Sequence, residues 1–237
     1  MLKKIILISL LFSAVLPAQS LNGLSGNYNI PIADVPNDRS ISLGLNYIAR
    51  QGLNYGGHKY DLVNYFFTLA YLPNLELSFR INALQNVGGN YTWDRMFSFK
   101  YRFLKENDLF PSIAIGLHNP YSTGAVEDVS HHFNSTYIVA TKTIKGIPFI
   151  QGIKITAGYG DDFIRSDDYQ YIGFFGGISA QINFDAAGKG YMEYMLEHDA
   201  ERFNTGIRLK LFNHISLLGG FLGFKYPCGG ASVSFSL

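Results

Sequence analysis

Charged side chains recur inside otherwise apolar, alternating stretches of the chain, and these residues are the best placed to do chemistry. In Met96–Phe103, MFSFKYRF, large apolar side chains alternate with Ser98, Lys100 and Arg102. Other stretches of the same kind add charges of both signs. The candidate binding residues are Glu76, Arg80, Lys100, Arg102, Lys154, Glu193, Glu197, Arg208 and Lys210. With three acids against six bases, the set suits an acidic polysaccharide or a lipid phosphate.

These charges have two possible roles, one in binding and one in structure. If the alternating segments are strands that close into a barrel with a water-filled lumen, the charges would form a polar track or a binding surface for a hydrated polymer. In a narrow barrel opposite charges usually pair, because an unpaired buried charge is costly. Glu76 and Arg80 fall on one face of a strand, within reach of Lys100 or Arg102 across the sheet. The pattern favours pairing, and the surplus of base leaves the binding role open.

Catalytic chemistry has only weak candidates in this sequence. Nucleophilic catalysis needs a nucleophile, a base and a group that orients the base. His118 precedes Ser122 and Glu127, and the run Glu197–Asp199 places a histidine between two acids. Neither matches a catalytic motif, so we predict no catalytic residue and no enzyme. A lipid-modifying barrel enzyme stays open as an alternative, as does a structural or adhesive barrel that acts through its extracellular loops.

Metal binding is also weakly supported. His131 and His132 lie beside acids in the longest loop, but a metal site needs converging ligands with fixed partners. Four aspartates flank another loop at 161–168, but the spacing of a calcium-binding loop is missing. We therefore predict no metal and no cofactor.

The charged residues lie in segments of strict alternation, which is typical of strands with two unlike faces. About twelve such strands can be traced, and most have the roughly nine to eleven residues that a tilted strand needs to cross a bilayer. Their approximate bounds are 39–50, 61–72, 74–83, 93–104, 110–118, 134–143, 147–159, 169–184, 190–198, 202–212, 214–224 and 229–237. Long and short connections alternate between the earlier strands, as in outer-membrane barrels.

Closure of the sheet follows from the nature of the apolar face. A bilayer can satisfy no unpaired strand edge, so the strands must close into a barrel. A soluble lipocalin-like barrel would carry charge along most outward faces, whereas the faces opposite the apolar ones here hold mainly Ser, Gly and Asn in several strands. The fold class is therefore an all-β, closed antiparallel transmembrane β-barrel of about twelve strands. An even strand number places the N- and C-termini together on the periplasmic side.

The remaining sequence divides the chain into three parts. Residues 1–20 have two lysines, an apolar run and small residues, the build of a secretory signal peptide. Residues 21–38 are either a periplasmic tail or a segment that enters the barrel mouth, and the barrel covers 39–237. A net charge of +1 argues against nucleic acid as a partner. The single cysteine, Cys228, forms no internal disulfide.

Several strands in order resemble a known family. The stretches WDRMFSFKYRFLKENDLFPSIAIGLHNPYSTG, STYIVATKT and IKITAGYG are similar to the outer-membrane proteins of the YjbH family. GLSGNYNIPIADVPNDRSISLGLNY and YMEYMLEHDAERFNTGIRLKLFNHISLLGGFL extend the likeness to nearly the whole exported chain. Departures include Ser98 for Asp, Thr136 for Glu and Thr141 for Ser.

The resemblance implies a role and a set of partners. It implies a barrel of the Gram-negative outer membrane linked to exopolysaccharide or capsule production and export. Its partners would be membrane lipid, the polymer and periplasmic export components, and it implies no catalytic site. Larger members of the family are longer, so this chain resembles a compact version.

Overall fold

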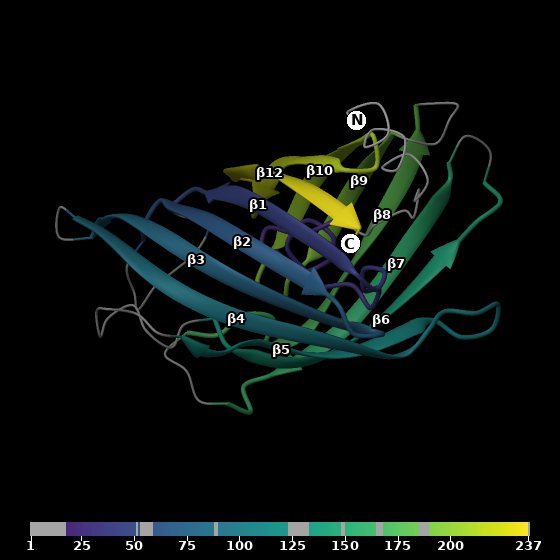
Figure 1. The fold of residues 1–237 in the computed structure, drawn as a ribbon, viewed down its shortest axis with the longest axis horizontal. Helices are drawn as coiled ribbons and strands as arrows, with labels where there is room; N and C mark the ends of the chain where they lie inside the picture. The colour runs from purple at the N-terminus through teal and green to yellow at the C-terminus, as the bar shows by residue number, and fades with distance from the viewer. Residues whose placement is uncertain are drawn as a thin grey trace, which may run out of the picture.

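A computed structural model shows the strands closed into a ring (Figure 1). The structure describes residues 18–50, 52, 59–87, 90–122, 133–147, 150–164, 168–184 and 190–236. The strands are β1 Ser40–Ile48, β2 Leu62–Ala70, β3 Leu75–Val87, β4 Asn90–Leu104, β5 Ser112–Ser122, β6 Ser135–Ile144, β7 Gly152–Asp161, β8 Gly173–Asn183, β9 Tyr191–His198, β10 Phe203–Leu211, β11 Ile215–Leu222 and β12 Tyr226–Ser236. Each pairs antiparallel with the next, and β1 pairs with β12. The predicted closed barrel of about twelve strands is confirmed.

Strict alternation decides which side chains each strand turns into the lumen. In β4, Ser98 and Lys100 are fully buried, whereas Tyr101 is 43% exposed and Phe103 is 51% exposed. Successive strand residues point to opposite faces, so a closed sheet sends one set inward and the other outward. The two unlike faces of the sequence are therefore the lumen wall and the outer wall.

The outer wall is apolar and aromatic. Its exposed side chains include Leu43, Leu45, Tyr65, Phe79, Ile81, Tyr101, Ile115, Ile138, Ile155, Tyr194, Leu196, Ile207, Leu217 and Phe221. A continuous surface of this kind is stable against hydrocarbon, and a closed sheet leaves no unpaired edge there. Within the described residues, no helix is long and apolar enough to span a membrane.

The two ends of the barrel differ in their connections. One end joins β2 to β3, β4 to β5, β6 to β7, β8 to β9 and β10 to β11, and we call it the short-turn end. The start of β1 and the end of β12 lie there too, as an even strand number requires. The opposite end, which we call the long-loop end, carries the connections that follow β1, β5 and β7.

Two strand pairs run further than the alternation predicts. β3 and β4 continue to Val87 and from Asn90, where a long loop was predicted, and β5 continues through Pro120 to Ser122. Backbone pairing does not require an apolar face once a strand leaves the hydrocarbon layer. The apolar period that marks the strands therefore stops before the strands do.

Residues 18–37, which we call the plug, coil inside the lumen (Figure 1, purple). Leu21 and Tyr28 have no exposed surface. Gly23 takes a φ of +78°, a conformation that residues with a Cβ rarely adopt, and it lets the plug turn sharply. Gly206 on the barrel wall leaves room for the Tyr28 ring, because a Cβ there would lie 2.4 Å from a ring carbon.

The plug connects directly to the first strand. Short bridges pair Gln19 with Ser25 and Gly26 with Pro31, so the segment folds back on itself before it reaches β1. Between the two alternatives for residues 21–38, the structure places most of the segment inside the lumen rather than in a tail outside it. Residues 1–17 of the predicted signal peptide lie outside the described residues.

Candidate functional site

A buried ion pair on the lumen wall, toward the short-turn end, bonds to the plug. Lys100 Nζ lies 2.9 Å from Glu76 Oε2, and neither side chain has exposed surface. β3 and β4 place the two residues directly opposite one another. The Ser25 backbone N–H donates to Glu76 Oε1 at 2.7 Å, and Lys100 Nζ donates to the Ser25 carbonyl at 2.8 Å. The pair therefore satisfies both a donor and an acceptor of the plug backbone.

A second buried pair holds the plug from the opposite wall. Arg208 on β10 pairs with Glu193, its cross-strand partner on β9. Arg208 Nη2 also donates to the carbonyls of Gln19, Gly26 and Asn27 at 3.2, 2.9 and 2.8 Å. A guanidinium has several donors in a fixed plane, so one side chain can serve a carboxylate and several carbonyls together.

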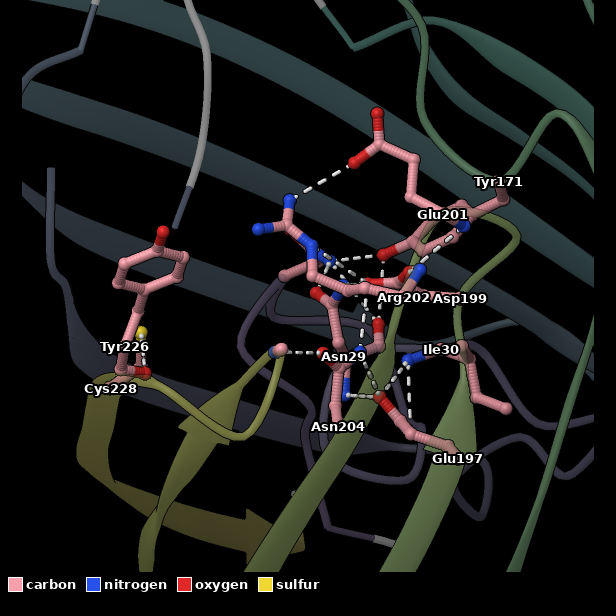
Figure 2. A network of polar contacts seen from close by, with 12 residues as sticks. Asn29, Ile30, Tyr171, Glu197, Asp199, Glu201, Arg202, Asn204, Tyr226 and Cys228 are labelled. Carbon is pink, nitrogen blue, oxygen red and sulfur yellow. Dashed lines mark hydrogen bonds and ion pairs between the residues drawn. The ribbon is translucent and has the colours of Figure 1, made fainter. Parts of the chain in front are cut away.

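Backbone N–H groups of the plug converge on one carboxylate near the long-loop end. Glu197 accepts from the N–H groups of Tyr28, Asn29 and Ile30 at 3.1, 2.7 and 3.3 Å (Figure 2). Carboxylates favour several charge-assisted bonds of this kind. The side chain is 1% exposed, so the plug backbone takes the place that water would otherwise fill.

Side chains from two connections fix Asn29 itself. Asp199, after β9, accepts from Asn29 Nδ2 at 2.9 Å, and the Tyr171 hydroxyl, before β8, donates to the Asn29 carbonyl at 2.8 Å (Figure 2). Burial raises the pKa of the Tyr171 hydroxyl well above its usual value, so it stays a donor. Asn29 is thereby joined to two connections of the long-loop end.

Three other lumen residues also form hydrogen bonds to the plug. Arg80 Nη1 donates to Asn22 Oδ1 at 2.7 Å. The amides of Asn46 and Asn64 both donate to the Leu21 carbonyl at 2.9 Å. These neutral partners were not predicted, because alternation marks a residue as inward-facing without naming its partner.

The short-turn end carries the two predicted bases that are only half-buried. Lys154 Nζ lies 2.8 Å from Asp34 Oδ2 on the plug. Arg102 Nη2 donates to Asn74 Oδ1 at 2.8 Å. Lys210 is buried on the lumen face of β10, and among the described residues its Nζ has no hydrogen-bond partner. Of the nine predicted residues, six contact the plug: Glu76, Arg80, Lys100, Lys154, Glu197 and Arg208.

Further basic residues surround this mouth, and we call their cavity the vestibule. It has a volume of about 490 Å³ and opens beside Asp34. Its basic side chains are Arg102, Lys105, Lys142 and Lys145, and its acids are Asp34, Glu106 and Asp108. Lys154 adjoins it through a neighbouring cavity that shares Asp34 and Lys145. Sequence reasoning missed the three added lysines, because they lie in or beside connections, where charge is expected in any barrel.

The sequence pattern that defines the YjbH family, described as exopolysaccharide biosynthesis proteins, matches residues 19–218. The chain belongs to the YjbH family. The match spans the plug from residue 19, strands β1 to β10 and the first half of β11 of this YjbH-family barrel. Among curated proteins no significant relative is found.

Solved structures with a similar fold are outer-membrane porins. The KdgM porin has a TM-score of 0.53 at 11% identity, covering 83% of this chain and 99% of its own. The KdgM porin in complex with disordered oligogalacturonate gives 0.54 at 11% identity, with the same coverage. A bacterial polysaccharide outer membrane secretin is more distant, with a TM-score of 0.40 at 7% identity over 86% of this chain and 100% of that one. At these identities the KdgM likeness establishes the fold.

The weaker candidates from the sequence can now be placed in the YjbH-family barrel. His118 is buried, with its Nε2 atom 2.9 Å from Gln170 Oε1 and its Nδ1 atom 3.3 Å from Ser98 Oγ. The side chain of Ser122, together with Glu127, His131 and His132, lies outside the described part of the chain. No group of three or more metal-binding side chains comes together in the described part.

Acid is expected to loosen the short-turn end of the plug. Burial raises the pKa of the Asp34 carboxyl, but the neighbouring cations Lys154, Lys100 and Arg102 outweigh burial and hold that pKa below its usual value. A lowered pKa contributes stability above the unfolded value, and this contribution is lost as pH falls through the folded value. The Asp34 contribution should therefore be lost below about pH 4, and planar-bilayer conductance should rise there.

Conductance measured against pH on two variants tests whether the acid response comes from Asp34. Asp34→Asn should conduct more than the wild type at pH 7 and vary less with pH. Asp38→Asn, an exposed neighbour, should follow the wild type. Equal profiles for Asp34→Asn and the wild type would refute a role for this ion pair.

Proposed function

We propose that this chain is an outer-membrane barrel that assists the production or export of an exopolysaccharide. Family membership supports the link to the polymer, and the porin-like fold with an apolar outer wall supports the membrane. In this proposal residues 1–20 direct export, and the short-turn end with both termini faces the periplasm, as in barrels with short periplasmic turns. The barrel works by binding and passage, without making or breaking bonds.

The observation that carries the proposal is the charge of the vestibule. Four basic side chains, Arg102, Lys105, Lys142 and Lys145, line it with three acids, Asp34, Glu106 and Asp108. The neighbouring cavity adds one base, Lys154, and one acid, Glu193, which is already paired with Arg208. An excess of one sign of charge in a cleft raises the local concentration of oppositely charged partners. An acidic polysaccharide arriving from the periplasm would meet this end first. The KdgM porin, which has a similar fold, is described in complex with disordered oligogalacturonate, and this supports an acidic polymer as the ligand.

The plug makes the described conformation a closed one. Lys100 and Arg208, which a polymer in the lumen would meet, are engaged by acids and by plug carbonyls. The polymer can reach them only after the plug leaves, when the same donors lose their plug acceptors. During passage, the acidic groups of the polymer would therefore replace the plug carbonyls as acceptors for the same lumen cations.

Vestibule and lumen cations are expected to respond differently to substitution. Arg102→Gln combined with Lys154→Gln should weaken binding of an acidic oligosaccharide such as hexagalacturonate about tenfold, because two cations that face the ligand are lost. Heat resistance of the folded barrel on gels should change little, since both residues are half-buried. Calorimetry on the purified barrel measures the binding of hexagalacturonate. Polymer release from cells tests whether weaker binding reduces export.

Arg95→Gln is the matched control. Arg95 lies on the same strand as Arg102, is exposed, and sits toward the long-loop end. It should bind hexagalacturonate as the wild type does. Unchanged binding by the vestibule variant would remove the main support for an acidic polymer.

A further inference from the structure

A cavity of about 400 Å³ opens beside the plug at the long-loop end. Three parts of the chain build its wall, namely residues 168–172 before β8, residues 199–202 after β9, and Phe133 before β6. Asn29 of the plug completes the lining. Figure 2 shows how Tyr171, Asp199 and Arg202 gather around Asn29. The cavity is thus formed jointly by loops and plug.

The lining combines aromatic rings with planar polar groups. Phe133, Tyr169 and Tyr171 supply rings, and Asn29 and Gln170 supply amides. Ligand sites are concave surfaces in which apolar and aromatic side chains are joined by a few convergent polar groups. A sugar ring has an apolar C–H face and a rim of hydroxyl groups, so it matches this combination of surfaces.

The charge of the cavity is opposite to that of the vestibule. Asp168, Asp199 and Glu201 line it against a single base, Arg202. Arg202 Nη2 already lies 3.1 Å from Glu201 Oε2, and its Nε lies 4.0 Å from Asp199 Oδ2. An acidic saccharide would therefore meet net repulsion here, whereas a neutral one can donate its hydroxyl groups to the carboxylates.

The backbone of the cavity wall has unusual conformations. Phe133, Tyr171 and Ala200 have φ values of 62°, 62° and 78°, in the left-handed region that favours glycine. Non-glycine residues in this region cost energy and persist where the surrounding structure holds them, often at ligand sites. All three line the cavity, and six other non-glycine residues of the described chain share this conformation elsewhere.

We propose that this cavity binds a neutral saccharide unit and that its occupation favours the plugged barrel. Asn29 is part of the wall, and Asp199 and Tyr171 hold Asn29 in place. The complete cavity exists only while the plug is seated. A ligand that binds one conformation better shifts the population toward it. A neutral sugar bound at the long-loop end therefore opposes release of the plug, at a site separate from the vestibule.

Calorimetry on the full-length barrel in detergent micelles tests the ligand class. The probes are neutral hexasaccharides of glucose, galactose, mannose or N-acetylglucosamine, with hexagalacturonate and spermine for comparison. At least one neutral probe should bind, and Tyr169→Ala should weaken it about tenfold through loss of ring contact. Phe163→Ala is the matched control, because that ring is 83% exposed on the same connection and does not line the cavity.

The link to the plug needs a second readout. The neutral probe that binds should lower the conductance of the wild-type barrel in planar bilayers, and Asn29→Ala should abolish that response. Heat-modifiable gel mobility confirms that each variant is folded. Binding of spermine alone, or of no neutral probe, would overturn the proposal. A neutral probe that binds but leaves the conductance of the wild-type barrel unchanged would overturn the proposed effect on plug opening. Hexagalacturonate binding to wild type and Tyr169→Ala alike would leave the vestibule proposal intact in either case.

Discussion

Removal of residues 21–35 is expected to convert the barrel into an open channel. The segment fills the lumen with fully buried side chains, and lumen side chains bond to its backbone. Twelve strands enclose more space than the eight whose interior side chains fill a small barrel, so removal of the plug leaves a water-filled passage. Ion conductance in planar bilayers should rise about tenfold or more, because conduction requires continuous water in place of packed side chains.

A reversible tether provides the control for this experiment. The Ala33 N–H donates to Thr141 Oγ1 at 2.9 Å, which brings the plug close to β6 at this point. Ala33→Cys with Thr141→Cys, in a Cys228→Ser background, should stay closed when oxidised, even at pH 3. Reduction should restore the acid response. A plug-deleted barrel that is folded by gel mobility but conducts no better than the wild type would contradict the assignment of residues 18–37 as the barrier.

The barrel could be predicted from sequence because its signal is local and repeated. In MFSFKYRF the alternation alone assigns Ser98 and Lys100 to the lumen and Tyr101 and Phe103 to the outer wall, as the structure shows. Lipid imposes this period on every strand, so an error in one segment does not change the fold. Where the period stops, as beyond residue 83 in β3, the predicted bounds were too short.

The plug could not be placed from sequence because its contacts are non-local. Asn29 and Glu197 are separated by 168 positions, and Asn22 and Arg80 by 58. Pro31 and Pro36 disfavour a central strand in this segment, but they are equally compatible with a tail and with a coil inside the lumen. Only the closed barrel brings the partners together.

The plug also explains the surplus of base that the sequence shows. Three acids in the predicted set cannot neutralise six bases, yet most of these bases have acceptors. Arg208 uses three plug carbonyls, Arg80 uses the Asn22 amide oxygen, and Lys154 uses Asp34. Oxygen atoms of the plug, including the Asp34 carboxylate, therefore act as acceptors for bases that have no acid on the barrel wall. Of the remaining bases, Arg102 lies in the vestibule, where solvent and an acidic ligand can reach it. Lys210 is buried on the lumen face of β10, and its Nζ has no hydrogen-bond partner among the described residues.

Glu76→Gln is expected to be the most destabilising single substitution in the lumen wall. It leaves the fully buried Lys100 ammonium without its carboxylate, although the Ser25 carbonyl still accepts. Breaking a buried ion pair by removing one partner costs about 3–5 kcal/mol, because the remaining charge is uncompensated. Urea unfolding of the barrel in lipid vesicles measures this free energy. Glu106→Gln should cost about 1 kcal/mol or less, because the Glu106–Lys142 pair is partly exposed at 3.6 Å.

The double variant Glu76→Gln with Lys100→Met separates the cost of the stranded charge from the value of the pair. With the Lys100 ammonium also removed, most of the lost unfolding free energy should return, because apolar replacement of a buried pair is often neutral. The plug should still be looser, since the Ser25 carbonyl loses the donor that held it. Conductance should then stay raised while barrel stability recovers. A double variant as unstable as Glu76→Gln would show instead that Glu76 supports the wall through Ser25 and not through Lys100.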